Sequence, residues 1–333
     1  MEAIFLTDWP ERYDLVYGPE ERKRFTAKVD TPDKLFSSDD ILSNPDDFRE
    51  VRYIFTTWGM PEFTEEQIRE IFPKLEAVFY AAGSVQSFAR PFLRCGVKIF
   101  SAWQAGAIPV AEYTVAQILL ATKGYFRAAT LCSNGDYQQA RQVRFQYPCN
   151  YGARVGIIGL GAIGDLVCQL LKPFDIEVVA YSRSLTQGRA DRMGVEKSDI
   201  DTIFKTCHVV SNHIANNVHT QGIFKKEHFE SMLPNAVFLN TGRGAQVVEP
   251  DLVEVLRNRP DLTAVLDVTD PEPPLENSPF YSLQNCILTP HIAGCNGLEL
   301  RRNTKWMEEE FDLYRAGKPC RYEVTEDMLE RMA

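Results

Sequence analysis

Short apolar runs rich in β-branched and aromatic residues alternate with stretches of helical periodicity along most of the chain. In the first hundred residues these runs predict strands at 3–6, 53–56, 77–80 and 97–100. A second series predicts strands at 155–158, 177–181, 209–212, 237–240, 263–267 and 287–289. Strands that alternate with helices build mainly parallel sheets, so we predict an α/β fold with two doubly wound parallel-sheet lobes.

Three segments between the strands have a distinct local character. Thr64 is followed three residues later by Gln67, a pattern typical of the capping box that begins a helix. The stretch 109–124 is apolar on nearly every face, with Pro109 at the first helical position, so we predict a helix that another surface buries. That surface can belong to the same chain or to a second subunit. The proline-rich stretch 270–275 predicts a short rigid loop.

Length and charge narrow the class of protein. A chain of 333 residues exceeds the roughly 250 to 300 residues at which single cores stop growing, so we expect two domains. The net charge of -10 has the wrong sign for binding nucleic acid or an anionic membrane surface. The first residues lack a basic run followed by an apolar one, and no apolar stretch approaches the roughly 18 residues of a membrane-spanning helix. We therefore expect a cytoplasmic protein without nucleic-acid or membrane partners.

The eight cysteines are scattered and form no CxxC pair, so we expect reduced thiols rather than a disulfide scaffold or a zinc ribbon. Cys286, His291 and Cys295 lie close together in the sequence. Their spacing matches no common zinc pattern, and we expect no metal site.

A glycine-rich turn follows the first strand of the second series. Gly159, Gly161 and Gly164 have the GxGxxG spacing, and apolar residues then recur at helical spacing. The first glycine would permit the tight turn, the second would let the backbone approach a pyrophosphate, and the third would let helix and strand pack closely. This context predicts a dinucleotide site rather than a merely structural turn. The expected contacts are Gly159, Gly161, Ala162, Ile163 and Gly164.

The end of the next strand indicates which dinucleotide is preferred. An acidic residue there would bind the ribose 2'-hydroxyl of NAD, but this chain has Ser182, Arg183 and Ser184. A guanidinium and two hydroxyls can hold a 2'-phosphate, so we predict that NADP is preferred. If Arg183 instead points to solvent or stacks on the adenine, NAD remains usable.

Three later loops hold reactive side chains. Arg243 lies in a glycine-flanked turn, Glu272 in the proline-rich loop and His291 after a proline, each directly after a predicted strand. Loops at the carboxyl ends of parallel strands converge on one crevice, so we expect the three side chains to meet. Taken singly, each would more often be an ordinary loop or surface residue.

The order and spacing of these elements resemble the D-isomer-specific 2-hydroxyacid dehydrogenase family, including its glyoxylate and hydroxypyruvate reductases. The resemblance covers most of the chain. It implies that Arg243 binds the substrate carboxylate and polarises its carbonyl, that His291 is the acid/base and that Glu272 is the partner of His291. The elements that carry it are 110–112, 156–164, 209–213, 240–244, 267–273 and 289–294.

Further site residues follow from the same resemblance. Asp267 is expected to contact the nicotinamide carboxamide, and Ala215 and Thr241 to contact the coenzyme. Backbone amides in the turn formed by Ala82, Gly83 and Ser84 are expected to hold the substrate carboxylate. The chain departs from the family at 214–217, where it reads Ile-Ala-Asn-Asn instead of the usual proline and threonine, so we expect an adenine pocket of different shape.

The resemblance also implies the architecture. A Rossmann dinucleotide-binding domain at 102–294 would be inserted into a flavodoxin-like substrate domain made of 1–101 and 295–333. Family members commonly form dimers through the helix that corresponds to 109–124, so a homodimer is expected.

The implied activity is the NAD(P)H-dependent interconversion of a small 2-oxo acid and a D-2-hydroxy acid. Negative charge develops on the carbonyl oxygen as hydride arrives, and His291 can deliver the proton while Glu272 stabilises the protonated imidazole. Arg243 can bond the substrate in a fork and fix one face of its C2 atom. Trp58 and Trp103 are either core residues or near the crevice, so substrate identity stays open.

Two other functions are compatible with the three reactive residues. One is a nucleotide-sensing interaction protein like the C-terminal-binding-protein corepressors, which share the fold and these side chains. The other is a phosphite-type dehydrogenase of the same superfamily. A formate dehydrogenase is disfavoured because those enzymes carry glutamine where this chain has Glu272.

Overall fold

The structure is a computed structural model that describes residues 1–330. The chain forms two compact units. We call the unit made of 1–106 and the segment from Cys295 onward the split domain, and the unit Ala107–Gly294 the continuous domain.

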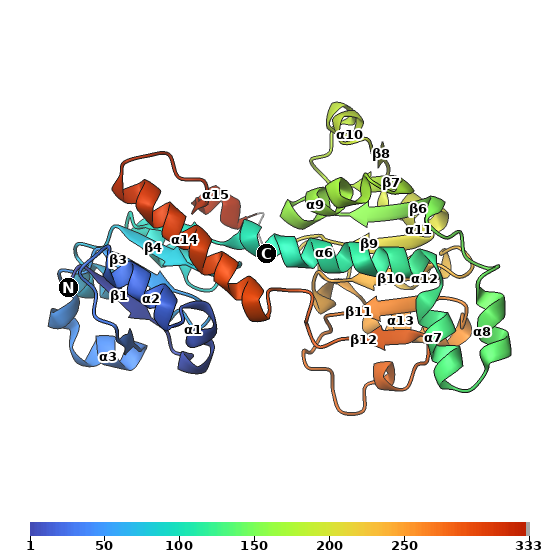
Figure 1. Ribbon diagram of the computed structural model, residues 1–333, viewed down its shortest axis with the longest axis horizontal. Coiled ribbons are helices and arrows are strands. Elements are labelled where there is room, and N and C mark those ends of the chain that lie inside the picture. Colours follow the sequence, from blue (N-terminus) through green and yellow to red (C-terminus); the bar gives the residue numbers. More distant parts are fainter. Residues whose placement is uncertain (331–333) are drawn as a thin grey trace. The chain divides into compact units, whose positions relative to one another are not determined.

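The split domain is built on a six-stranded sheet with the order β13-β5-β4-β3-β1-β2. Its strands β4, β3 and β1 lie side by side (Figure 1). All neighbours pair in parallel except β13, which is antiparallel to β5. The order 2-1-3-4-5 of the parallel strands is the flavodoxin-like one, which confirms the prediction. The strands are β1 (Ala3–Leu6), β2 (Leu35–Phe36), β3 (Tyr53–Thr56), β4 (Ala77–Tyr80), β5 (Lys98–Ser101) and β13 (Glu323–Val324).

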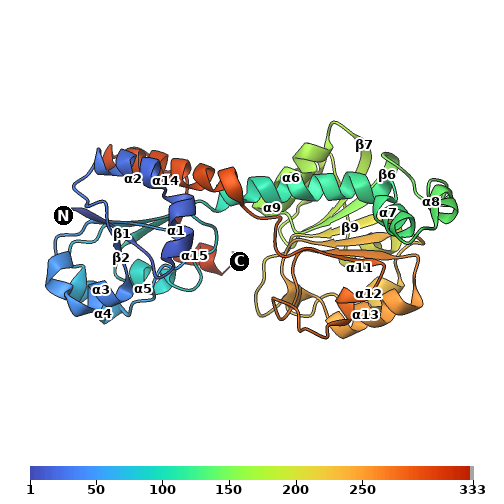
Figure 2. The ribbon, with the colours of Figure 1, turned by 60° about the horizontal axis from the view of Figure 1, so that its bottom comes forward.

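Helices cover both faces of this sheet (Figure 2). Successive residues of β1 alternate between the faces: Phe5 packs with one layer, and Ile4 and Leu6 with the other. The layer on Phe5 holds α1 (Pro10–Val16), α2 (Pro19–Thr26) and α14 (Leu300–Arg315). The opposite layer holds α3 (Ser38–Ser43), the turn η1 (Pro45–Phe48), α4 (Glu65–Ile71), α5 (Ala89–Arg94) and α15 (Glu326–Leu329). The capping box before α4 forms as predicted, because Thr64 and Gln67 exchange hydrogen bonds of 2.9 and 3.2 Å.

The continuous domain has a seven-stranded sheet in which all strands are parallel, with the order β12-β11-β10-β9-β6-β7-β8. Counted within the domain this is 3-2-1-4-5-6 with one further strand, which is the Rossmann order, so the predicted Rossmann fold is confirmed. The order reverses between β6 and β9, where ligands bind in such sheets. The strands are β6 (Tyr151–Ile158), β7 (Asp175–Tyr181), β8 (Glu196–Lys197), β9 (Val209–Asn212), β10 (Val237–Asn240), β11 (Thr263–Leu266) and β12 (Cys286–Leu288).

Two helical layers sandwich this second sheet (Figure 2). One layer consists of α6 (Trp103–Thr122), α7 (Tyr125–Ser133), α9 (Ala162–Leu171) and α10 (Gln187–Met193). The other consists of α11 (Ile200–Thr206), α12 (Lys226–Glu230) and α13 (Glu249–Asn258). The remaining short elements are α8 (Tyr137–Val143), η2 (Gly244–Gln246), η3 (Pro279–Tyr281) and η4 (Gly297–Glu299).

The helix predicted at 109–124 is longer and begins earlier than the sequence suggested. It is α6, which starts at Trp103 and has Pro109 in its interior. Apolar residues before the proline explain the difference, since Ala105 already packs in the core of the split domain. The proline removes one backbone donor without ending the helix. Helix α6 therefore contributes its first residues to the split domain and the rest to the continuous domain.

The expectation that no apolar stretch reaches spanning length is wrong for α6. This 20-residue helix is long and apolar enough to cross a membrane by length and composition, with a mean hydropathy of 1.2 over the relevant window. Half of that window is buried within the structure, where α6 supplies Ala111, Ile118 and Ala121 to the core. A core helix meets the same criteria, so this single helix is weak support for a membrane span.

Candidate active site

The glycine turn after β6 has the geometry that a dinucleotide site needs. Gly159 has φ of 102°, and a Cβ atom there would lie 2.5 Å from the carbonyl carbon of His213. A Cβ atom on Gly164 would lie 1.9 Å from the carbonyl oxygen of Gly159, so helix α9 can approach the strand only with glycine there. A Cβ atom on Gly161 would meet nothing within 4 Å. Open space thus lies at the N-terminus of α9, where Ala162 and Ile163 present backbone N–H groups that have no partner within the helix.

The turn after β7 carries the residues predicted to choose between coenzymes. The Oγ atoms of Ser182 and Ser184 lie 3.3 Å apart, and the Arg183 side chain is exposed. A second guanidinium is nearby in the fold, because Arg189 donates to the Leu160 carbonyl oxygen at 3.3 Å and to the Asp165 carboxylate at 2.6 Å. Arg189 therefore lies against the glycine turn, which the sequence analysis did not anticipate.

The loop after β9 borders the same turn. β6 lies between β7 and β9 in the sheet, so the turns that follow these three strands are neighbours. His213 accepts or donates a hydrogen bond of 2.8 Å between its Nε2 atom and Ser211 Oγ. Burial lowers the pKa of His213 to about 3, so the imidazole is neutral. Within residues 1–330, His213 Nδ1 and Asn216 Oδ1, on either side of Ala215 in the sequence, are buried without a hydrogen-bond partner.

The loops after β10, β11 and β12 meet at the same edge of the sheet. The His291 Nδ1 atom lies 2.7 Å from Glu272 Oε1, and His291 has a positive φ of 54°. Burial lowers the pKa of Arg243, and the charge of the Glu272 carboxylate partly counteracts this. A Cβ atom on Gly244 would lie 2.0 Å from the carbonyl carbon of Thr269, so the first two loops pack in direct contact. The arrangement can bind an anion and exchange a proton with it.

Asp267 anchors the loop that carries His291. Its carboxylate accepts from Thr289 Oγ1 at 2.6 Å and from the backbone N–H groups of Ile292 and Ala293 at 2.9 Å each. Its carbonyl oxygen accepts from the His291 N–H at 2.9 Å. In the structure Asp267 thus positions the loop that carries His291. Its contact with the coenzyme stays a prediction.

Helix α6 reaches the site through two hydroxyl contacts. Tyr113 Oη lies 3.2 Å from Thr289 Oγ1, and Thr114 Oγ1 lies 3.4 Å from Thr241 Oγ1. Thr241 is buried at this contact, so its side chain packs against the helix. The predicted coenzyme contact of Thr241 is not tested by this arrangement.

The turn predicted to hold the substrate carboxylate lies in the split domain. Ser101 Oγ donates to the carbonyl oxygens of Ala82 and Gly83 at 2.9 and 2.6 Å, and Ser84 is exposed. A Cβ atom on Gly83 would meet nothing within 4 Å, so this turn borders open space. The joint action of this turn with Arg243 remains a prediction.

Three buried amide side chains beneath the Arg243 loop were missed by the sequence analysis. Asn212, Asn240 and Gln246 are all fully buried and hydrogen-bonded to one another. An available signal was the asparagine that ends each of the mainly apolar strands 209–212 and 237–240.

The described part of the chain holds no disulfide and no cluster of side chains arranged as metal ligands. All eight cysteines are free thiols. No group of three His, Cys, Asp or Glu side chains in residues 1–330 is arranged to hold a metal ion, and Cys286 is buried in the core behind α13.

The fold and the site define a two-domain α/β protein with a Rossmann dinucleotide-binding domain. The family described as D-isomer specific 2-hydroxyacid dehydrogenase, NAD binding domain, matches residues 115–293, more than half of the chain. The chain belongs to the D-isomer-specific 2-hydroxyacid dehydrogenase family, as the sequence analysis predicted.

Individual relatives show how far this similarity extends. D-3-phosphoglycerate dehydrogenase of Archaeoglobus fulgidus is 30% identical over 198 residues, which cover 60% of this chain and 37% of that protein. Human glyoxylate reductase/hydroxypyruvate reductase is 31% identical over 187 residues, covering 55% and 56% of the two chains. Rhodotorula graminis D-mandelate dehydrogenase has a similar fold, with a TM-score of 0.80, 18% identity and 98% of each chain covered. The matched part thus spans 37% of the length of the first of these curated relatives and 56% of the length of the second.

Proposed function

We propose that this protein is an NAD(P)H-dependent oxidoreductase that interconverts a small 2-oxo acid and the corresponding D-2-hydroxy acid. The observation that carries the proposal is the 2.7 Å hydrogen bond between His291 and Glu272 on loops that pack beside Arg243. These loops follow β10, β11 and β12 of a Rossmann sheet whose glycine turn leaves open space at the N-terminus of α9.

Arg243, His291 and Glu272 have separate roles in the proposed reaction. When bound, the reduced nicotinamide coenzyme supplies hydride to C2 of the 2-oxo acid. Arg243 binds the substrate anion as a permanent cation and fixes which face of C2 is presented. His291 donates a proton to the carbonyl oxygen as negative charge develops there, and Glu272 holds the imidazole in orientation through Nδ1. In the oxidative direction His291 takes the hydroxyl proton back.

The coenzyme we propose is NADP in preference to NAD. The support is an exposed Arg183 between two hydroxyls, with Arg189 held near the glycine turn and no carboxylate at 182–184. Replacement of Arg183 by Ala is expected to raise the Kd of NADPH more than that of NADH, measured by quenching of protein fluorescence. Equal losses for the two coenzymes would contradict the preference.

The activity is tested with a panel of 2-oxo acids that includes glyoxylate, hydroxypyruvate and a larger aromatic acid, each with NADPH and with NADH. Oxidation of the coenzyme at 340 nm with at least one acid is expected. Tight coenzyme binding without turnover on any acid would favour the corepressor-like alternative, and turnover on phosphite alone would favour the phosphite-type enzyme.

A homodimer formed through α6 is part of the proposal. Large apolar side chains stay exposed at its end and on the next segment, including Leu120, Tyr125, Tyr137 and Phe145. Sedimentation equilibrium is expected to give twice the chain mass, and Tyr125→Glu is expected to shift it toward the monomer. We also propose a cytoplasmic location, supported by eight free cysteines.

A further inference from the structure

Beneath the Arg243 loop, three side-chain amides hold the backbone of two different loops at once. Asn212 ends β9, Asn240 ends β10, and Gln246 lies in the turn η2 that follows. All three are fully buried. Asn212 Nδ2 donates to Asn240 Oδ1 at 2.9 Å and to Gln246 Oε1 at 2.5 Å, so the three amides form one cluster, which we call the amide cluster.

On one side the amide cluster fixes the loop that carries Arg243. The Arg243 N–H donates to Gln246 Oε1 at 3.2 Å, and the Arg243 carbonyl oxygen accepts from Asn240 Nδ2 at 3.1 Å. The Gly242 N–H donates to Asn240 Oδ1 at 3.1 Å. Both backbone polar groups of Arg243 are therefore held by side chains, which sets the direction in which its guanidinium leaves the backbone.

On the other side the amide cluster fixes the loop that borders the glycine turn. The Ile214 N–H donates to Asn212 Oδ1 at 3.1 Å, and the Ile214 carbonyl oxygen accepts from Gln246 Nε2 at 2.7 Å. This loop touches the glycine turn directly, because a Cβ atom on Gly159 would lie 2.7 Å from the Ile214 nitrogen. A group bound at the glycine turn would therefore lie beside the Ile214 loop, which is hydrogen-bonded to the amide cluster.

The side-chain atoms that join the three amides to one another already make as many hydrogen bonds as they can. Asn212 Nδ2 uses both hydrogens, and the oxygens of Asn240 and Gln246 each accept two hydrogen bonds. A Cβ atom on Gly242 would lie 2.8 Å from Asn212 Nδ2 and 2.9 Å from Gln246 Oε1, so no side chain fits between cluster and backbone. A shift of one loop must therefore break a buried hydrogen bond or move the other loop.

We propose that the amide cluster couples coenzyme binding at the glycine turn to the positioning of Arg243, with Asn212 and Gln246 as positioning residues. This inference rests on the proposed function, since it assigns the two loops to coenzyme and substrate. Coenzyme held against the 213–216 loop fixes Ile214, and the cluster passes that restraint to both backbone groups of Arg243. The substrate site is then ordered only after the coenzyme has bound.

The test is hydrogen–deuterium exchange of the full-length protein with saturating NADPH, measured on peptides that cover Gly242 and Arg243. In the wild type we expect the coenzyme to slow exchange there by at least about fivefold, the lower end of ordinary coupling between sites. In Asn212→Leu/Gln246→Leu, which removes both routes from Ile214 to Arg243, the slowing is expected to fall below about twofold, even with coenzyme saturating. Fivefold slowing retained in this double variant would overturn the inference.

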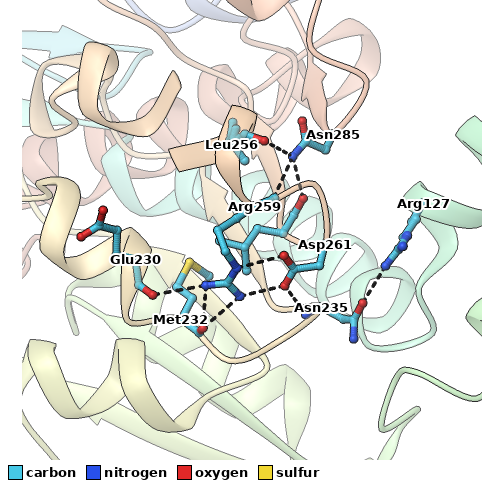
Figure 3. Close-up of polar contacts among 9 residues, drawn as sticks. Arg127, Glu230, Met232, Asn235, Leu256, Arg259, Asp261 and Asn285 are labelled. Atoms are coloured by element: carbon cyan, nitrogen blue, oxygen red, sulfur yellow. Dashed lines mark hydrogen bonds and ion pairs between the residues drawn. The ribbon is translucent and has the colours of Figure 1, made fainter. Parts of the chain in front are cut away.

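A matched control separates coupling from stability. Asn285 is an amide of the same domain that donates to the backbone oxygens of Leu256, Arg259 and Leu262 at 3.0, 3.3 and 3.0 Å (Figure 3). It lies just before β12 begins, whereas the loops of Ile214 and Arg243 follow the ends of β9 and β10 in the same parallel sheet, so they lie at the opposite edge. Asn285→Leu is expected to lower the urea midpoint and to leave the coenzyme-dependent slowing at Arg243 unchanged. Loss of the slowing in this variant would also contradict the inference.

The single variants Asn212→Leu and Gln246→Leu guard against poor folding of the double one. Each leaves fewer buried backbone groups without a partner than the double variant does, so its urea midpoint is expected to be higher. Each also leaves one route between Ile214 and Arg243, so the slowing at Arg243 is expected to be reduced but not abolished. Fivefold slowing retained in both single variants would show that the amides are merely structural. If the wild type binds no nicotinamide coenzyme, the proposed function fails as well, whereas turnover on a 2-oxo acid with unaltered coupling in the variants defeats this inference alone.

Discussion

Replacing Glu272 by Gln separates the charge of the partner of His291 from its shape. The two side chains lie 2.7 Å apart, but His291 is 43% exposed and Glu272 is 41% exposed. Solvent screens a pair of this exposure, and such pairs contribute about 0.2–1 kcal/mol. Since about 1.4 kcal/mol corresponds to a tenfold change in rate, loss of the charge is expected to lower kcat by a factor of roughly 1.4 to 5. The glutamine can still accept the hydrogen bond from the imidazole.

His291→Asn is expected to have a much larger effect than Glu272→Gln. His291→Asn removes the proton donor itself, so its kcat is expected to fall by roughly 10² to 10⁴. Both variants are compared with the wild type by NADPH oxidation at pH 7, with the best 2-oxo acid of the panel. Glu276→Gln, which alters an exposed carboxylate in the same loop, is the control and should have wild-type kcat. A loss of 10² or more in Glu272→Gln would refute the screening argument, and full activity in His291→Asn would refute the acid/base role.

Gly164→Ala should lower the free energy of unfolding by about 1–3 kcal/mol in urea titration, since its Cβ atom would meet the Gly159 carbonyl oxygen. Gly161→Ala should fold normally, because its Cβ atom meets nothing within 4 Å, and should lose coenzyme affinity in fluorescence titration. The pKa of His213 is about 3 when folded and near 6.5 when unfolded, so the unfolded chain takes up a proton first and stability falls as the pH drops through this interval. Between pH 7 and pH 5 the free energy of unfolding of His213→Gln, measured by urea titration, should therefore fall by up to about 2 kcal/mol less than that of the wild type. Asp267→Asn places an amide hydrogen against one of the N–H groups of the His291 loop and should lower kcat at least about tenfold without raising the Kd of NADPH equally. Equal changes in kcat and Kd would show that Asp267 acts on coenzyme binding instead.

Strand positions and the glycine turn were predictable because they depend on local rules. A parallel strand buried on both faces is a continuous apolar run, and β1, β3, β4, β9 and β10 have the predicted bounds. The capping box at Thr64 likewise depends only on residues three positions apart. These features need no knowledge of what packs against them.

The start of α6 was predicted wrongly because Pro109 is ambiguous on its own. Proline is common in the first turn of a helix, but here Trp103–Gly106 extend the helix before it. Those residues are held by packing in the split domain, which a local pattern does not reveal.

The amide cluster was missed for a related reason. A buried asparagine and an exposed one are the same letter, and the three amides come together only when β9 and β10 pair and η2 folds back beneath them. The pairing of His291 with Glu272 was predictable in outline, since both follow strand ends. The anchoring of the His291 loop by Asp267 was not, because it depends on the conformation of the loop.

One domain is continuous in the sequence and the other consists of two segments, so the two differ in how readily each can be expressed alone. The continuous domain is one uninterrupted stretch, 107–294, so it can be encoded as a single fragment, whereas the split domain would need an artificial joint. A fragment beginning at Ala107 cuts α6 after its fourth residue and leaves Pro109 in the new first turn. There the missing N–H is no longer a defect, because the opening N–H groups of any helix lack an intrahelical acceptor. The residue that interrupts the intact helix would thus make the excised one easier to begin.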